Sequence, residues 1–411
     1  MAQSRYTMEE VLMAAGTPQE LWNEIYQQQY AQELLTHEYD TVAIDQKSLA
    51  NYIKSNLSQD RDRAGINQNL IEQWDENLKH AQKLWMLADA GGGELVQVRS
   101  QSAFGRRYYK GPNLQNTPKI VRHAALGTCH EYDIESSVFA WKLSWFRKIC
   151  QAHTTTIHMP ATLELLDHKQ AIRRRLAQVV FDTTSAWAVN KIKEFITAIG
   201  FGAPLRGVGY VADGRYQRPA LAQIITAKTR LDRAMADPWV QQFYQEQNNM
   251  NDVVVALARV NLAQELALVP ELWEKGGKKL KTNSVVSYLY QHAEREILDW
   301  AEEFCADREV LLTVHDCIYT RRPVKLAEFR WGIQQFGEFF RLEHTEHRAY
   351  GWEDAVLPTD PFYDPREAAV QKQLDRYDAK KTPDHWNGSG YDGTAEYEPE
   401  LDPYLDVNHS I

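Results

Sequence analysis

Apolar and polar positions in the first ninety residues follow the period of helices. Residues 18–36, 47–57 and 67–88 each place apolar side chains three and four positions apart, which predicts amphipathic helices. The glycines at 91–93 then interrupt this pattern and mark a boundary. We therefore interpret residues 1–93 as a helical N-terminal region.

Helical periodicity also dominates the middle of the chain. Residues 138–150, 161–181 and 185–199 predict three helices, and a helical pattern returns over residues 220–272. Further on, residues 283–305 predict a long helix, which is followed by a strand pattern. These segments make the chain mostly helical, with a few strands between the helices.

Two short segments have the pattern of strands instead. Residues 311–319 form an apolar run of β-branched and aromatic residues with His315-Asp316 inside it, which predicts a strand, a tight turn and a returning strand. Residues 130–133 predict a strand that ends in Asp133, and a helix with an apolar face follows. The sequence therefore predicts an α+β fold with an aspartate at the end of each of two strands.

These aspartates are the first candidates for chemistry. An aspartate at a turn often serves the turn itself, by hydrogen bonds to nearby backbone groups. Two aspartates on separate strand ends can also share a pair of divalent cations, which clamps the attacking and leaving oxygens of a phosphoryl displacement. Alone, Asp316 is explained by its turn; together, Asp133 and Asp316 indicate a metal site.

Composition bounds the setting of this chemistry. The chain has 411 residues, of which 44% are hydrophobic, so it can bury a large core. No apolar run reaches membrane-spanning length and the N-terminus has no signal-peptide pattern, so we expect no membrane partner. The four cysteines lack the paired spacing of a metal site, and we interpret them as reduced thiols of a cytosolic protein.

Net charge at first argues against a nucleic-acid partner, because the chain carries −10. Residues 382–411, however, hold seven acids and no lysine or arginine, so the rest of the chain carries only −3. Basic clusters then stand out at residues 106–110, 173–175 and 275–281. Each cluster can be a solvated surface or a contact for phosphates. From about residue 366 the apolar periodicity fades, and we interpret residues 366–411 as an acidic, disordered tail.

Six short motifs along the chain occur in an order that resembles a known protein family. The motifs are Gly105-Arg106, Pro112 to Pro118, Tyr132-Asp133, Lys191 with Phe195, Asn283 with Gln291, and Val314-His315-Asp316. Their order resembles the polymerase core of family A, which DNA polymerase I shares with the phage-type single-subunit RNA polymerases. The resemblance covers residues 100–345. An unrelated metal-dependent nuclease or primase is the alternative.

The resemblance implies a right-hand polymerase architecture. Residues 94–150 would form the first part of a palm, with a small antiparallel sheet and a motif that contacts the template strand. Residues 151–272 would form helical fingers, and residues 273–365 the second part of the palm. The acidic tail would follow.

The resemblance also implies roles for individual residues. Asp133 and Asp316 would be catalytic and would hold two Mg²⁺ ions, and Lys191 would contact the triphosphate and assist catalysis. The expected nucleotide-binding residues are Lys191, Lys193, Phe195, Ile199 and Arg174. The expected nucleic-acid-binding residues are Gly105, Arg106, Asn113, Gln115, Asn283, Gln291 and His315.

Departures from the family pattern bear on the substrate. Val138 stands where the DNA polymerases carry a glutamate that excludes a 2′-hydroxyl, and Cys317 stands where they carry a second glutamate. Both departures favour the RNA polymerase branch.

The fingers helix departs from the pattern as well. Ile199 replaces an expected tyrosine, and Trp187 replaces an expected arginine. A shifted register pairs Lys193 with Phe201 and restores an aromatic residue, and one of residues 173–175 can replace the arginine. The register of this helix therefore stays open.

The short N-terminal region leads to the partner prediction. About 100 residues precede Arg106, fewer than a phage polymerase uses ahead of its palm. The chain therefore resembles the larger catalytic subunit of a split RNA polymerase of N-four-type podoviruses, acting in the bacterial cytosol. Its partners would be DNA template, nascent RNA, NTPs, a smaller second subunit and, as a further candidate, a single-stranded-DNA-binding protein. The alternative is a truncated family A DNA polymerase; a degenerate scaffold is disfavoured because both aspartates remain.

Overall fold

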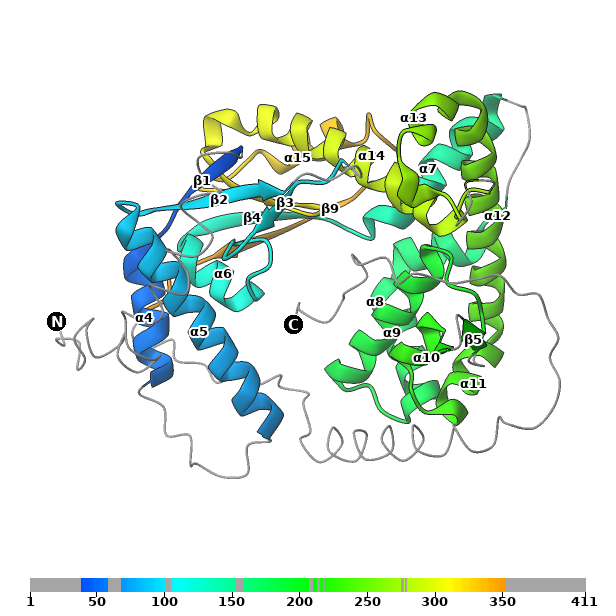
Figure 1. Cartoon of the computed structure of the whole chain (residues 1–411), viewed down its shortest axis with the longest axis horizontal. Coiled ribbons are helices and arrows are strands. Elements are labelled where there is room, and N and C mark those ends of the chain that lie inside the picture. Colours follow the sequence, from blue (N-terminus) through cyan, green and yellow to red (C-terminus); the bar gives the residue numbers. More distant parts are fainter. Residues whose placement is uncertain are drawn as a thin grey trace.

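The protein has an α+β fold, in which antiparallel sheets adjoin a large helical lobe (Figure 1). The computed structural model describes residues 38–57, 68–100, 105–152, 158–206, 210–212, 215–217, 219–274, 277 and 279–351. Within these residues, none of the helices combines the length and the apolar character needed to span a bilayer.

A four-stranded antiparallel sheet lies at the centre of the fold. Its strand order is β7-β8-β4-β9, and the strands are β7 (Val310–Val314), β8 (Cys317–Thr320), β4 (Cys129–Ile134) and β9 (Leu342–His347). In this register Asp133 lies opposite Cys317 on one side and Glu343 on the other. Because side chains alternate along a strand, Glu131 and Asp133 share one face, and His130 and Tyr132 share the other.

A smaller layer precedes this sheet in the chain. Its elements are β1 (Tyr39–Ala43), α4 (Gln46–Leu57), α5 (Gln68–Ala90), β2 (Glu94–Ser100), β3 (Tyr108–Lys110) and α6 (Lys119–Leu126). The three strands form an antiparallel sheet in the order β1-β2-β3. Helices α4, α5 and α6 share a buried core with β7 and β8, to which Leu49, Leu126 and Tyr319 contribute. This layer therefore packs on the central sheet.

The helical lobe follows β4. It contains α7 (Ser137–Ala152), α8 (Pro160–Phe181), α9 (Ala186–Gly200), β5 (Tyr210–Ala212), β6 (Arg215–Gln217), α10 (Ala220–Ile224), α11 (Lys228–Ala236), α12 (Pro238–Asn261) and α13 (Ala263–Ala267). Helix α12 begins at Asp237, whose carboxylate accepts hydrogen bonds from the backbone N–H groups of Trp239 and Val240. That cap breaks the long helical pattern of this segment.

The chain then returns to the sheet through η2 (Pro270–Leu272), α14 (Thr282–Phe304), η3 (Ala306–Arg308) and, after the β7–β8 hairpin, α15 (Leu326–Ile333). Phe329 of α15 contacts the ring of Tyr132, so α15 packs on the face of β4 away from Asp133. Figure 1 shows α14 and α15 above the strands.

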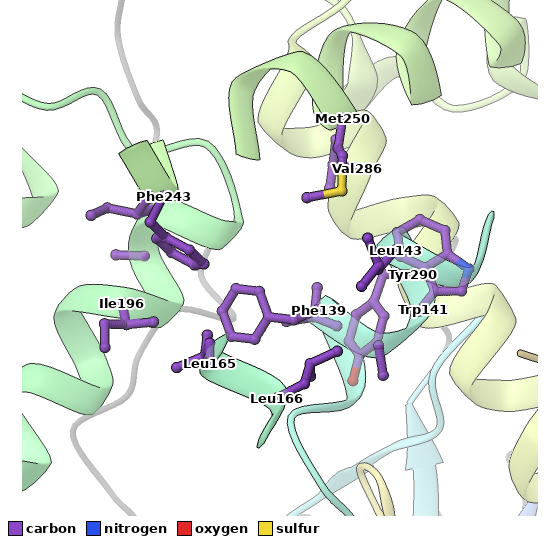
Figure 2. Packing of buried hydrophobic residues seen from close by; sticks show 14 of the residues in the cluster. Phe139, Trp141, Leu143, Leu165, Leu166, Ile196, Phe243, Met250, Val286 and Tyr290 are labelled. Carbon is purple, nitrogen blue, oxygen red and sulfur yellow. The ribbon is translucent and has the colours of Figure 1, made fainter. Parts of the chain in front are cut away.

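One hydrophobic core joins the sheet to the helical lobe. Phe139 of α7 packs edge-to-face on Phe243 of α12, and Tyr290 of α14 lies near Trp141 of α7 (Figure 2). The fully buried Lys142 donates hydrogen bonds to the carbonyl of Gly200, at the end of α9, and to Gln247 and Asn251 of α12. Helix α7 is therefore tied to both α9 and α12.

Most of the predicted elements are confirmed. The hairpin with His315-Asp316 at its turn, the strand ending near Asp133 and the helices at 138–150, 161–181, 185–199 and 283–305 all occur within a few residues of their predicted bounds. The segments at 18–36 and 366–411 lie outside the described residues.

The pattern of residues 325–343 predicts a further helix, and this prediction is wrong in its second half. Helix α15 ends at Ile333, and the chain turns and enters the strand β9. Strand β9 carries a single apolar residue, Leu342, and lies at the edge of the sheet with most of its side chains exposed. It therefore lacks the alternation by which a strand is recognised.

Candidate active site

The two candidate catalytic aspartates lie on a strand of the central sheet and in the hairpin turn that adjoins it. Asp133 is the fifth residue of β4, and Asp316 forms the turn between β7 and β8. The backbone N–H of Ile134 donates to the carbonyl of Asp316 at 2.9 Å, which extends the β4–β8 pairing to the turn. His315 adopts a left-handed conformation with φ of 52°, so the hairpin reverses within two residues.

The aspartates form a negatively charged site. Burial, together with the charges of Asp316 and Glu131, raises the pKa of Asp133 to about 7, although Lys119 and Lys169 act in the opposite direction. Among the residues that the structure describes, no lysine or arginine forms an ion pair with either Asp133 or Asp316. Carboxylate oxygens without a paired cation are the donors that a divalent cation such as Mg²⁺ prefers, so the residues fit the expected metal.

Side chains from two helices hold Asp316 in place. Ser137, at the start of α7, donates its hydroxyl hydrogen to Asp316 Oδ2 at 2.6 Å. The hydroxyl of Tyr290 on α14 lies 2.6 Å from Ser137 Oγ and 3.3 Å from Glu294 Oε1. This chain of contacts connects the carboxylate of Asp316 to the buried face of α14.

Arg106 ends this chain of contacts. Its Nε donates to Glu294 Oε2 at 2.6 Å. Burial and the nearby Asp316 raise the pKa of Glu294 to about 7, while Arg106 acts to lower it. The expected contact of Arg106 with a template phosphate stays a prediction, and it would compete with this ion pair.

Gly105 has a close neighbour of its own. It has φ of +81°, and a Cβ added there would lie 2.7 Å from the ring of His292 on α14. A side chain at this position would be strained twice, by its backbone conformation and by this contact. The structure therefore explains Gly105 by the packing of its loop on α14.

Asn113 and Gln115 shape the loop that precedes α6. Asn113 donates to the carbonyls of Tyr109 and Gly111 and accepts from the backbone N–H of Asn116. Gln115 donates to the carbonyl of Arg107 at 2.8 Å. Both side chains are buried, so they organise the loop, and their contact with nucleic acid stays a prediction.

Arg122 of α6 forms hydrogen bonds with the same loop. Its guanidinium donates to the carbonyls of Leu114, Gln115 and Thr117. These three carbonyls converge on one side chain that is itself buried. No pattern in the sequence indicates this role of Arg122, because the interaction brings together a helix and the loop before it.

The remaining residues expected to bind nucleic acid, Asn283, Gln291 and His315, lie on α14 and in the hairpin turn. Gln291 is buried, donates to Ser287 Oγ at 3.1 Å and accepts from the hydroxyl of Tyr108 at 3.1 Å. Asn283 packs against Gly202, just after α9. Burial lowers the pKa of His315 to about 3, with Arg106 and Arg122 adding to the effect, so its imidazole is neutral. Their contacts with nucleic acid stay predictions.

The predicted fingers helix is α9, and its side chains divide into two sets. Phe195 and Ile199 are completely buried, so contact with a nucleotide would require them to leave the core. Lys191 is partly exposed and forms an ion pair with Glu194, with its Nζ 2.8 Å from Oε2. Of these three, Lys191 alone lies at the surface.

A basic cavity of about 600 Å³ lies between α8 and α9. It is lined by Gln170, Arg173, Arg174, Thr184, Ala186, Val189, Asn190 and Lys193. Burial lowers the pKa of Arg173, whose Nε has no hydrogen-bond partner among the described residues. Arg175 takes no part, because it forms an ion pair with Asp237 at 2.7 Å. The cavity therefore brings Arg174 together with Lys193, and leaves out Lys191.

Sequence reasoning missed the side chains that support Asp316. Tyr290 and Glu294 lie four residues apart and so share one face of α14, which was a usable signal for an inward-facing polar pair. Ser137 had no signal of its own, because a serine at the start of a helix is common.

Comparisons with known proteins give a limited likeness. No protein-family model matches the chain, and no curated protein matches it. Among solved structures, the chain is similar to the POL domain of Pol1 from M. smegmatis, in complex with DNA primer-template and dNTP, with 14% sequence identity and a TM-score of 0.42. The match covers 84% of this chain and 64% of that chain, so this chain spans less than two thirds of that structure.

Proposed function

We propose that this protein is a nucleotidyltransferase that extends a nucleic-acid strand on a template, with Asp133 and Asp316 as its metal ligands. The observation that carries the proposal is the arrangement of these carboxylates. Asp133 lies on β4 and Asp316 in the turn before the neighbouring strand β8. Neither has a paired cation among the described residues, and Ser137 holds Asp316. Two partly buried carboxylates without a paired cation lower the stability of the fold, whereas their oxygens are suitable ligands for divalent cations.

The chemistry follows from that arrangement. Two Mg²⁺ ions bound to such carboxylates would supply activation of a 3′-hydroxyl and neutralisation of the charge on a leaving pyrophosphate. The protein contributes the fixed position of Asp316, which Ser137 and Tyr290 restrain. It also contributes the burial of Asp133, which strengthens the interaction of its carboxylate with a cation.

The basic cavity supports a site for the triphosphate. Arg174 and Lys193 both line it, and polyphosphate groups bind where several cationic and amide donors converge. We therefore infer that Lys193 contacts the triphosphate, with Arg174 in the place of the arginine absent at Trp187. Lys191, already paired with Glu194, is the alternative.

Ribonucleotides are the substrates that we propose, and the product would be RNA made on a DNA template. Val138 supports this choice, because it offers no carboxylate near Asp133 to oppose a 2′-hydroxyl. Cys317 supports it through the same resemblance to the RNA polymerase branch. A phage origin and a smaller second subunit rest on the resemblance alone.

The test is a primer-extension assay on a DNA template with Mg²⁺. The purified chain should incorporate NTPs and discriminate against dNTPs, and Asp316→Asn should not extend the primer. If the chain prefers dNTPs, the proposal of a template-directed polymerase would stand, but the proposal that its product is RNA would be overturned. Equal extension by the wild type and Asp316→Asn would overturn the proposal as a whole. Copurification of a small second polypeptide with the chain would separately test the partner.

A further inference from the structure

A second group of potential metal ligands lies on the central sheet, apart from the aspartate pair. His123 comes from α6, Glu131 from β4 and His347 from β9. One ligand atom from each of the three lies within 4.8 Å of the other two. Two consecutive elements, α6 and β4, and the distant strand β9 therefore direct two imidazoles and a carboxylate to one point.

The contacts show how the three side chains are oriented. Nε2 of His123 lies 3.1 Å from Glu131 Oε2, and Nε2 of His347 lies 2.6 Å from the same oxygen. The two imidazole rings face each other, with their centroids 3.6 Å apart. Glu131 is 6% exposed, His123 19% and His347 15%, so bulk water has limited access to this point.

The charge of Glu131 is already compensated without the histidines. Lys119 donates to Glu131 Oε1 at 2.7 Å, which leaves Oε2 for the two rings. Both rings present their Nε2 to that oxygen. In a tetrahedral zinc site with bonds of about 2.0–2.1 Å, ligand atoms lie roughly 3.3 Å apart. This is close to the 3.1 Å between His123 and Glu131 and longer than the 2.6 Å between His347 and Glu131.

We propose that His123, Glu131 and His347 bind a divalent transition-metal ion of the Zn²⁺ class. Two imidazoles and one carboxylate form a ligand set that suits Zn²⁺ and its neighbours, whereas Mg²⁺ prefers oxygen ligands alone. The site is chemically distinct from the pair of Asp133 and Asp316, although Glu131 and Asp133 share a face of β4. The inference does not depend on the polymerase proposal.

The bound ion would fasten the edge of the sheet. Strand β9 is an edge strand with few buried side chains, and His347 is its last residue. An ion that joins His347 to β4 and α6 would stabilise the pairing of this strand, because binding to the folded state alone adds to the free energy of unfolding. Strand β4 carries Asp133, so the ion would also restrain the candidate catalytic strand.

The test is a Zn²⁺ titration of the full chain against a chromophoric chelator, with millimolar Mg²⁺ present to occupy the aspartate pair. We expect one Zn²⁺ per chain, and affinity reduced by at least about tenfold in His123→Ala and in His347→Ala. The matched controls are His130→Ala and His344→Ala. These histidines lie on the same two strands and contact each other at 3.2 Å on the opposite face, and their loss should leave the affinity unchanged. Asp133→Asn should also leave it unchanged.

A second measurement needs no variant. Co²⁺ bound by two imidazoles and a carboxylate should give visible absorption bands that one equivalent of Zn²⁺ removes. The proposal is overturned if the wild type binds no stoichiometric Zn²⁺ and shows no Co²⁺ bands, or if His123→Ala and His347→Ala bind as tightly as the wild type. It is also overturned if Asp133→Asn abolishes binding, since the ion would then lie at the aspartate pair.

Discussion

The aspartate pair and the basic cavity have opposite charges and are built in opposite ways. Asp133 lies on β4, and Asp316 lies in the turn before the strand β8 that pairs with it. Ser137 of α7 hydrogen-bonds to Asp316, and Tyr290 of α14 contacts Ser137 in turn. Arg174 and Lys193 are long, exposed side chains on two helices, and their positions depend on how α8 packs against α9. Strand register therefore determines the first site, and helix packing determines the second.

This difference determines how each site tolerates change. A carboxylate held by hydrogen bonds cannot move to replace its neighbour, so each aspartate should be indispensable. Several flexible cations that surround one cavity can share an anion, so the loss of one should be partly compensated. The buried Lys142 joins α7, which follows the first site, to α9, which lines the second.

Removal of one carboxylate charge should have the largest effect on activity. Asp316→Asn keeps the size of the side chain but loses a metal ligand, and we expect nucleotide addition to fall by about 10³-fold or more, equivalent to roughly 4 kcal/mol. Single-turnover extension rates at saturating Mg²⁺ measure this. The control is Glu343→Gln, which removes a carboxylate opposite Asp133 on β9 and should have little effect. A similar loss in both variants would contradict the assignment.

The link between the two sites can be broken at Lys142. Lys142→Met leaves the carbonyl of Gly200 and the side-chain oxygens of Gln247 and Asn251 without their donor, and should lower the free energy of unfolding by about 1–3 kcal/mol. Denaturant unfolding measures this. The control is Lys148→Met on the same helix, where the side chain is exposed and little should change.

The same variant should show a pH dependence. Burial lowers the pKa of Lys142 from 10.5 to about 7. Between these pH values the unfolded chain binds more protons than the folded chain, so the wild type gains stability from this site as pH rises. The deficit of Lys142→Met relative to the wild type should therefore grow from pH 7 towards 10.5. A deficit that stays constant over this range would show that the buried ammonium stays charged.

Removal of one lysine from the basic cavity should lower activity less than removal of Asp316, and only one of the two neighbouring lysines should matter. Lys193→Ala should lower kcat/KM for the incoming nucleotide by about 10- to 100-fold, because it removes one phosphate contact among several. Lys191→Ala is the matched comparison on the same helix, and it should cost less than about threefold because an exposed ion pair contributes little. The reverse order would assign the triphosphate to Lys191 and restore the original register.

The smallest effect is expected when the hydroxyl groups that restrain Asp316 are removed. Tyr290→Phe removes only the hydroxyl next to Ser137, and we expect kcat to fall by about 3- to 10-fold, since one hydrogen bond contributes about 0.5–1.5 kcal/mol. The concentration of Mg²⁺ needed for half-maximal rate should rise in parallel. Ser137→Ala should act through the same chain of contacts, so the double variant should lose less than the product of the single losses. Independent, multiplicative losses would show that the two hydroxyls do not act together.

The sequence by itself determined the local elements and the carboxylates. The apolar run around His315-Asp316 predicts a buried hairpin, and the strand that ends near Asp133 leads directly into a helix with an apolar face. These are local properties, set by side-chain periodicity over a few residues. Strand β9 escaped prediction because its polar, exposed residues have no such periodicity.

Only the tertiary structure decided which polar side chains meet. Glu294 is one of several acids on a long helix, and α14 turns it inward to Arg106, which lies 188 positions earlier. The sequence left both Lys191 and Lys193 as candidates for the triphosphate contact. The packing of α8 on α9 places only Lys193 in the basic cavity. His347 meets His123 and Glu131 because β9 pairs with β4. Such contacts depend on the relative positions of whole elements, which the burial of the shared core determines.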